Sequence, residues 1–175
     1  MVPGTGTQGF DLHSEIVTLL PRLRRFCMAI ARNGDAGDDL CQATIERALS
    51  RADQFVVGTR LDSWMYRIAQ NIMIDSARRQ RTRGVEIEVE DAFGLAGDNG
   101  VQIVEGRSEL ARARAAMAAL PDDQRTLLSL VVLDGMSYKE AAATLQIPIG
   151  TVMSRIARAR RAIDARINAS AGVVQ

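Results

Sequence analysis

Cysteine and histidine are scarce in this sequence, and their scarcity argues against several kinds of site. Cys27 and Cys41 are the only thiols and His13 is the only imidazole among 175 residues. The two cysteines are too few and too far apart for a disulfide framework or a CxxC pair, and with one histidine they argue against a structural zinc site. We therefore expect no metal and no cofactor.

Long apolar runs are also absent. No stretch approaches the ~20 apolar residues that cross a bilayer, and the N-terminus has no charged region leading into an apolar run. These absences predict a cytoplasmic protein with no direct membrane insertion.

A strong net charge is missing as well, because 22 basic and 21 acidic side chains leave a formal charge of +1. The total charge therefore does not indicate a nucleic-acid partner. The charge is nevertheless segregated, since arginine clusters at 78–83 and 155–161 lie on either side of an acidic stretch at 86–91. Local fields of this kind matter more for binding than the total does.

Catalytic groupings are not evident. The chain shows no convincing pair of carboxylates, nucleophile with a base, or phosphate loop, which argues against an enzyme. Residues 4–9 match a dinucleotide fingerprint formally, but no strand precedes them. The aspartates at 35, 38 and 39 are the one cluster that a small nuclease could use for metal, and helix capping explains them more simply.

Residues 137–152 are the most informative stretch that is present. Ser137 followed by Glu140 predicts a capping box, in which each side chain accepts a hydrogen bond from the other residue's backbone N–H. The helix that starts there can continue only to about Leu145, because Pro148 disfavours helical geometry just before it and suits the first turn of a new helix. Upstream, a supporting helix is predicted from Pro121 to near Gly135.

The second helix of this pair has two different faces. Apolar side chains recur on one face from Val152 to Ile167 at three- and four-residue steps. The other face carries hydroxyls and guanidinium groups, at Thr151, Ser154, Arg155, Arg158 and Arg161. This pattern is typical of a helix-turn-helix whose second helix enters a DNA major groove. The alternative is a helical hairpin with a solvated arginine face, but the small residues at 141–143 favour the close helix crossing of a DNA-binding motif.

Three helices are predicted in the N-terminal half, at about 14–32, 38–52 and 61–79. Pro21 can kink or split the first helix. Asp38 and Asp39 are expected in the first turn of the second helix, where they suit the positive end of the helix dipole.

The third of these helices carries both core and binding candidates. Trp64 lies on its apolar stripe, which predicts a core residue. Asn71 and Asp75 lie one turn apart on a polar face, and a basic tail begins at Arg78. A polar pair in solvent is one interpretation, but the basic tail makes a nucleic-acid surface the better one.

The acidic, glycine-containing segment 84–106 separates two helical regions. Residues 85–90 alternate like a strand, although a flexible tether is the preferred interpretation. We therefore predict an all-α fold of two small domains, 1–83 and 107–175, with a flexible acidic linker between them. An extended linker of ~23 residues spans ~75 Å.

Two sets of motifs resemble one known family. Residues 38–44 (DDLCQAT) and 63–71 (SWMYRIAQN), with Asp75 and the arginines at 78 and 79, resemble the first conserved domain of sigma-70 family factors of the extracytoplasmic-function group. Leu120-Pro121, the 137–148 helix-turn and residues 150–160 are similar to the promoter-binding domain of the same group. The resemblance covers nearly all of the chain after about residue 14, with both sets in the right order.

The resemblance implies a sigma factor that binds core RNA polymerase and directs promoter-specific initiation. It also implies a stress-responsive protein that an anti-sigma factor controls and that is monomeric when free of its partners. The polymerase-binding helix of the family corresponds here to Asp39, Gln42 and Glu46. Cap or solvent roles are the alternative for these three residues.

For promoter DNA, the resemblance implies two groups of contacts. The −10 element would be bound by Thr59, Arg60, Trp64, Asn71, Asp75, Arg78 and Arg79. An amide such as that of Asn71 can recognise the edge of an unstacked base, whereas arginines hold phosphates. The −35 element would be bound by Thr151, Ser154, Arg155, Arg158 and Arg161 in the major groove. Met153 stands where many members of the family carry Lys or Arg.

A free-standing helix-turn-helix regulator that binds duplex operators, as a dimer, is the rival hypothesis. It leaves the first domain unexplained, because that domain has no evident ligand pocket. Binding to core polymerase distinguishes the two hypotheses.

Overall fold

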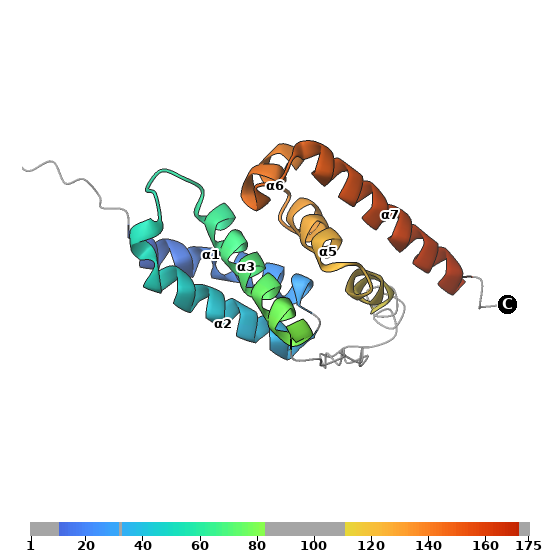
Figure 1. Ribbon diagram of the computed structural model, residues 1–175, viewed down its shortest axis with the longest axis horizontal. Coiled ribbons are helices and arrows are strands. Elements are labelled where there is room, and N and C mark those ends of the chain that lie inside the picture. Colours follow the sequence, from blue (N-terminus) through green and yellow to red (C-terminus); the bar gives the residue numbers. More distant parts are fainter. Residues whose placement is uncertain (1–10, 32, 83–110, 172–175) are drawn as a thin grey trace, which may run out of the picture.

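The computed structural model describes residues 11–31, 33–82 and 111–171 (Figure 1). Within these ranges every regular element is a helix, so the all-α prediction is confirmed. The predicted linker 84–106, with its strand-like alternation at 85–90, lies outside the described residues.

The N-terminal half contains α1 (Leu12–Ile30), α2 (Gly34–Ser50), the short 3₁₀ helix η1 (Ala52–Gln54) and α3 (Leu61–Thr82). The buried side of α1 includes Leu23 and Ile30. Pro21 lies inside α1 and neither splits nor ends it. Its side chain is exposed, and Val17, whose carbonyl loses its helical donor, is 69% exposed, so water can satisfy that carbonyl.

The predicted start of the second helix was wrong by about one turn. The helix α2 begins at Gly34 because Asn33 is its N-cap, and the Asn33 side chain accepts a hydrogen bond from the Ala36 N–H at 2.8 Å. Asp38 and Asp39 therefore lie beyond the first turn. Asp38 instead accepts two hydrogen bonds from Arg24 of α1, at 2.7 and 3.0 Å, and so joins the two helices.

The close crossing of α1 and α2 depends on a glycine. A Cβ added to Gly37 would lie 2.9 Å from the Cα of Met28 in α1. No side chain fits at that distance without movement of the backbone. Gly37 therefore sets how near the two helices can approach.

The C-terminal half contains the helix 111–118, α5 (Asp122–Leu128), the π-helical turn η2 (Ser129–Leu133), α6 (Tyr138–Leu145) and α7 (Ile149–Ala171). The predicted capping box is present, with Ser137 as the N-cap of α6 and Glu140 at its third position. Gln146 adopts a left-handed conformation (φ 54°) and begins the turn into α7. The predicted supporting helix does not stay α-helical to Gly135, because it widens into η2 after Leu128.

The two halves pack against each other. The helix α1 lies against α5 and η2, and α3 lies against α6. The buried apolar side chains of both halves form one continuous core, to which Leu23 and Met65 contribute from the first half and Leu127 and Val152 from the second. This closed arrangement places the start of α3 beside the helix-turn-helix.

Candidate nucleic-acid interface

The outer face of α7 presents polar and cationic groups to solvent. Its inner face is fully buried at Val152, Ile156 and Ala159, which fixes the helix against the rest of the domain. Of the predicted −35 residues, Ser154, Arg158 and Arg161 are exposed, and Thr151 is half-buried.

Arg155 behaves differently from the other arginines of α7. It is half-buried, and its Nε lies 3.0 Å from the Asp123 carboxylate at the start of α5. The exposed arginines are held only by long hydrogen bonds to backbone carbonyls of their own helix, at 3.3 Å each for Arg158 and Arg161. Arg155 therefore joins two helices, while the other two can be redirected toward a ligand at little cost.

Two apolar side chains on α7 were not among the predicted site residues. Ile149 and Met153 lie one turn apart at the start of the helix and are 47% and 54% exposed. Apolar side chains in a major groove can contact the methyl group of thymine. The signal in the sequence was the replacement of a basic residue by Met153 on an otherwise polar face.

The loop before α3 carries part of the predicted −10 site. A tight turn closes at Thr59, whose N–H and hydroxyl both donate to the Val56 carbonyl, at 3.1 and 2.7 Å. Gly58 supplies the positive φ (92°) that this turn needs. Val56 and Val57 are 65% and 64% exposed, so the loop presents apolar surface that sequence reasoning did not identify.

The predicted −10 residues of α3 divide into a packed end and an exposed face. Trp64 is half-buried and packs on Phe55, with ring centroids 5.2 Å apart, as the core prediction required. Asn71, Arg78 and Arg79 are exposed. Asp75 is half-buried and lies 3.8 Å from Arg47 of α2, so it ties α3 to its neighbour.

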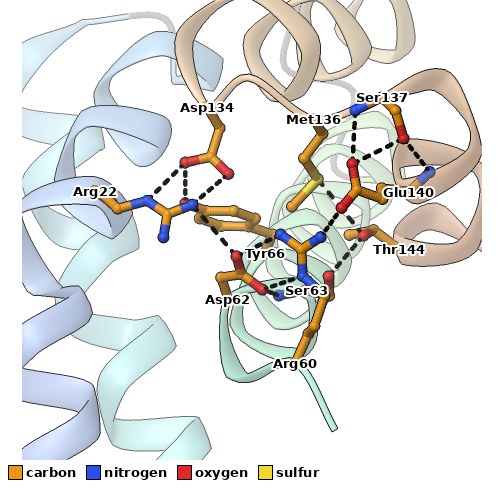
Figure 2. Close-up of polar contacts among 10 residues, drawn as sticks. All are labelled: Arg22, Arg60, Asp62, Ser63, Tyr66, Asp134, Met136, Ser137, Glu140 and Thr144. Carbon is orange, nitrogen blue, oxygen red and sulfur yellow. Dashed lines mark hydrogen bonds and ion pairs between the residues drawn. The ribbon is translucent and has the colours of Figure 1, made fainter.

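Arg60 is the one predicted −10 residue that the structure places against the helix-turn-helix (Figure 2). Its Nε and Nη2 donate to the two carboxylate oxygens of Asp62, at 3.1 and 2.8 Å, and its Nη1 donates to Glu140 of α6. Burial acts to raise the pKa of Asp62, but hydrogen bonds from Arg60 and the Ser63 N–H outweigh it, and the pKa lies below its usual value. This carboxylate is therefore held ionised.

The face of α2 that was predicted to bind polymerase is open to solvent. Asp39, Gln42 and Glu46 are all exposed. The Gln42 amide donates to Glu46 at 3.0 Å, so the two side chains present one ordered polar surface. This face lies on a different helix from both groups of DNA-binding candidates.

Within the described ranges, no group of three or more histidine, cysteine, aspartate or glutamate side chains could hold a metal ion. Among the same residues, no helix combines the length and the apolar character needed to cross a membrane.

Two family models match the chain. Sigma-70 region 2 matches residues 16–83, and Sigma-70, region 4 matches residues 108–163. An ECF RNA polymerase sigma factor, EcfG of Rhodopseudomonas palustris (strain TIE-1), is 37% identical over 89% of this chain and 84% of its own length. The RNA polymerase sigma-H factor of Pseudomonas aeruginosa is 35% identical over 72% of this chain and 70% of its own length.

Solved structures show the same arrangement of helices. The sigma factor RpoE of Bartonella quintana, in complex with the anti-sigma factor NepR, superposes with a TM-score of 0.75 at 30% identity and covers 94% of this chain and 99% of its own. CnrH in complex with the cytosolic domain of CnrY gives a TM-score of 0.65 at 24% identity, over 90% of this chain and 87% of that one, and supports the fold.

Proposed function

The chain belongs to the extracytoplasmic-function group of RNA polymerase sigma factors, in the sigma-70 family, and from this premise we propose which of its surfaces carry the function. The α2 face binds core RNA polymerase, the start and outer face of α3 bind the −10 element, and α7 binds the −35 element. The observation that carries the assignment is the outer face of α7. It offers hydroxyl and guanidinium groups in the region 4 match, while its inner face is buried at Val152, Ile156 and Ala159.

The polymerase contact is assigned to Asp39, Gln42 and Glu46. These side chains are exposed, and the amide and the glutamate carboxylate are already ordered by their mutual hydrogen bond. A preordered polar surface loses less side-chain freedom on binding than a mobile one. This supports α2 as a docking surface.

The −10 contact is assigned to the loop and α3. The Asn71 amide can donate to and accept from the edge of an unstacked base, and the exposed Val56 and Val57 can cover its face. Arg78 and Arg79 would hold phosphates, which gives affinity without sequence preference. Thr59 and Arg60 lie in the same loop, and Trp64 packs on Phe55 at the start of that loop. Asp75 pairs with Arg47 of α2 and so holds α3 in place.

The −35 contact is assigned to exposed groups of α7. Arg158 and Arg161 can reach guanine edges or phosphates, and Ser154 can bond to either. Thr151 is positioned beside Ser154, whose hydroxyl donates to the Thr151 carbonyl at 3.0 Å. Arg155 contributes by holding α7 against α5.

Regulation and cellular context follow from the family. The sigma factor RpoE was solved with the anti-sigma factor NepR bound, and we propose that such a partner controls this chain in a stress response. Catalysis would belong to the polymerase, and the chain would act in the cytoplasm as a monomer until it binds its partners.

The test uses the full chain with purified core RNA polymerase. Co-elution in gel filtration and new start sites on a supercoiled pool of genomic fragments are expected. A double substitution, Asp39→Ala with Gln42→Ala, should abolish co-elution, whereas Asp53→Ala, which removes an exposed carboxylate outside the α2 face, should leave it unchanged. Tight duplex binding without any polymerase binding would instead establish the free-standing regulator.

A further inference from the structure

Arg60, at the end of the loop that is proposed to bind the −10 element, contacts the helix-turn-helix of the same chain (Figure 2). Arg60 donates to Asp62 within its own helix start and to Glu140 across the interface. Glu140 divides its carboxylate between two tasks, because Oε2 accepts from the Ser137 N–H and hydroxyl at 2.8 Å each while Oε1 accepts from Arg60. The residue that caps α6 therefore also engages a proposed DNA-binding arginine.

A second carboxylate of the C-terminal half engages α1 and α3 nearby. Asp134 accepts hydrogen bonds from Arg22 Nε and Nη2, at 3.1 and 2.9 Å, and from the Tyr66 hydroxyl at 2.7 Å. Its side chain is only 5% exposed. Arg22 also reaches Asp62 at 3.3 Å, so the two ion-pair groups share one carboxylate and form a single network.

A neutral contact completes this network. The Thr144 hydroxyl of α6 donates to the Ser63 hydroxyl at the start of α3, at 2.9 Å. The start of α3 is thus held to both ends of α6, through Glu140 and through Thr144.

The closed arrangement cannot span a promoter with two elements. The path from Glu140 through the turn to Arg161, the furthest proposed −35 residue, is at most ~40 Å long, given the rise of a helix and the reach of an extended chain. The two promoter elements lie ~60 Å apart, at somewhat under two duplex turns of ~34 Å. Arg60, which contacts Glu140, and α7 therefore cannot reach their elements together while the network is intact.

From these contacts we infer that Glu140 and Asp134 act as an intramolecular ligand that holds the chain in a closed form unable to engage both promoter elements. This inference rests on the proposed function, because it takes Arg60 and α7 as DNA-binding groups. Asp62 accepts from the Nε and Nη2 of Arg60, and Glu140 accepts from the remaining Nη1. A phosphate oxygen accepts from a guanidinium N–H as a carboxylate oxygen does, so Glu140 takes the Nη1 position that a DNA phosphate would otherwise use.

The Arg60–Glu140 part of the network is exposed, which suits it to opening. Arg60 and Glu140 have side chains that are 46% and 43% exposed, and ion pairs at such positions contribute little to stability. Opening leaves the Glu140 cap on α6 intact, because that cap uses the other carboxylate oxygen. Separation of the two halves therefore frees the Nη1 group of Arg60, which stays paired with Asp62 through Nε and Nη2, without unfolding the helix-turn-helix.

A reversible cross-link between Ser63 and Thr144 tests the inference directly. The two side-chain oxygens lie 2.9 Å apart, so cysteines at these positions are placed to form a disulfide. The native Cys27 and Cys41 are 0% and 5% exposed and Thr144 is 4% exposed, so the single cysteine variants serve as controls for oxidation of the native thiols. The double variant, Ser63→Cys with Thr144→Cys, is assayed with core polymerase on a two-element promoter before and after reduction, beside each single cysteine variant.

The reduced variant should initiate transcription within about twofold of the unmodified chain, and the oxidised variant should initiate at least tenfold less, with recovery on reduction. Equal initiation by the oxidised and reduced forms would overturn the inference. Failure of the reduced form and of the unmodified chain to initiate at all would instead overturn the proposed function.

A second variant decides the case if the cross-link does not form. Asp134→Asn with Glu140→Gln removes both charges, while glutamine preserves the capping box. The concentration of this variant that gives half-maximal initiation should fall by about threefold or more. An unchanged or higher concentration, with the helical content retained, would show that the carboxylates do not restrain the chain.

Discussion

Arg125 of α5 donates a hydrogen bond from its Nε to the carbonyl oxygen of Ile30, at the end of α1, over a distance of 3.0 Å. The same guanidinium donates to the carbonyls of Ala118 and Leu120, at 3.0 and 3.3 Å, and pairs with Asp122. Its side chain is 1% exposed. One buried cation therefore joins the two halves of the chain and the helix 111–118, apart from the polar network around Arg60.

Replacement of Arg125 by Met should destabilise the protein by about 3 kcal/mol, because three carbonyls lose their donor in a buried site. Arg125→Lys should recover only part of this loss, since an ammonium cannot match the geometry of the guanidinium fork. Urea unfolding, followed by the fluorescence of the single tryptophan Trp64, measures both values. A loss below about 1 kcal/mol for the Met variant would contradict the structural role of this cation.

Two glycines of α2 should respond differently to replacement by alanine, because only one of them lies at the close crossing with α1. Gly37→Ala should cost about 2 kcal/mol, because the new methyl group would lie 2.9 Å from the Met28 Cα and the helices must move apart. Gly34→Ala is the matched control, since its methyl group meets only the flexible end of Met28, at 3.7 Å. The control should be neutral or slightly stabilising, because alanine favours the helix. Equal unfolding midpoints for the two variants would show that the crossing is not so tight.

Asn71→Ala should impair promoter opening more than polymerase binding. The exposed amide is assigned to an unstacked base of the −10 element, which is available only when the duplex opens. Open complexes are scored by permanganate reactivity of unpaired thymines, and polymerase binding by gel filtration. Ser76→Ala, also exposed on α3, serves as the control. Loss of both activities to the same extent would count against a base contact.

The two thiols should be inert in the folded protein. Burial, together with the neighbouring Cys41, raises the pKa of Cys27, and burial also raises the pKa of Cys41. A protonated, buried thiol is a poor nucleophile, so neither should react with a disulfide reagent at pH 8 within minutes, whereas both should react in denaturant. Rapid reaction of either thiol in the folded chain would show that α1 and α2 separate readily.

Acid should weaken the ion pairs that Asp62 makes at the start of α3. The folded-state pKa of Asp62 is lowered, so its contribution to stability is present above the usual carboxylate pKa of about 4 and is lost as the pH falls through the lower folded-state value. Asp62→Asn should therefore cost about 2 kcal/mol at pH 7 and progressively less below about pH 4. Urea midpoints across this range test the sign, and a difference that grows toward low pH would refute it.

The candidate site was predictable wherever the relevant chemistry is local. The capping box at Ser137 and the break before Pro148 depend on neighbouring residues, and both lie where the sequence indicated. Helical periodicity places Val152, Ile156 and Ala159 on the buried face of α7, although Ile167, at the end of the same stripe, is 44% exposed. The start of α2 was missed because Asn33 satisfies the first free N–H groups one turn before the aspartates could.

The roles of several charged residues could not be predicted because they depend on partners distant in the sequence. Arg60 and Glu140 are separated by 80 positions, and Arg22 and Asp134 by 112, so no local pattern indicates that they meet. Arg155, by contrast, belongs to a predicted DNA-binding face but is turned back to Asp123. In each case the tertiary structure decides which charges remain free for a ligand.

The sequence by itself therefore determined the helices, the helix-turn-helix, the scarcity of metal-binding and catalytic groups, and the family, because these depend on periodicity, capping and short motifs. Only the tertiary structure decided that the two halves share one core and that the Glu140 carboxylate of one half accepts a hydrogen bond from Arg60 of the other. That arrangement depends on packing and on charges that are 80 or more positions apart in the sequence, so no local pattern in the chain indicates it.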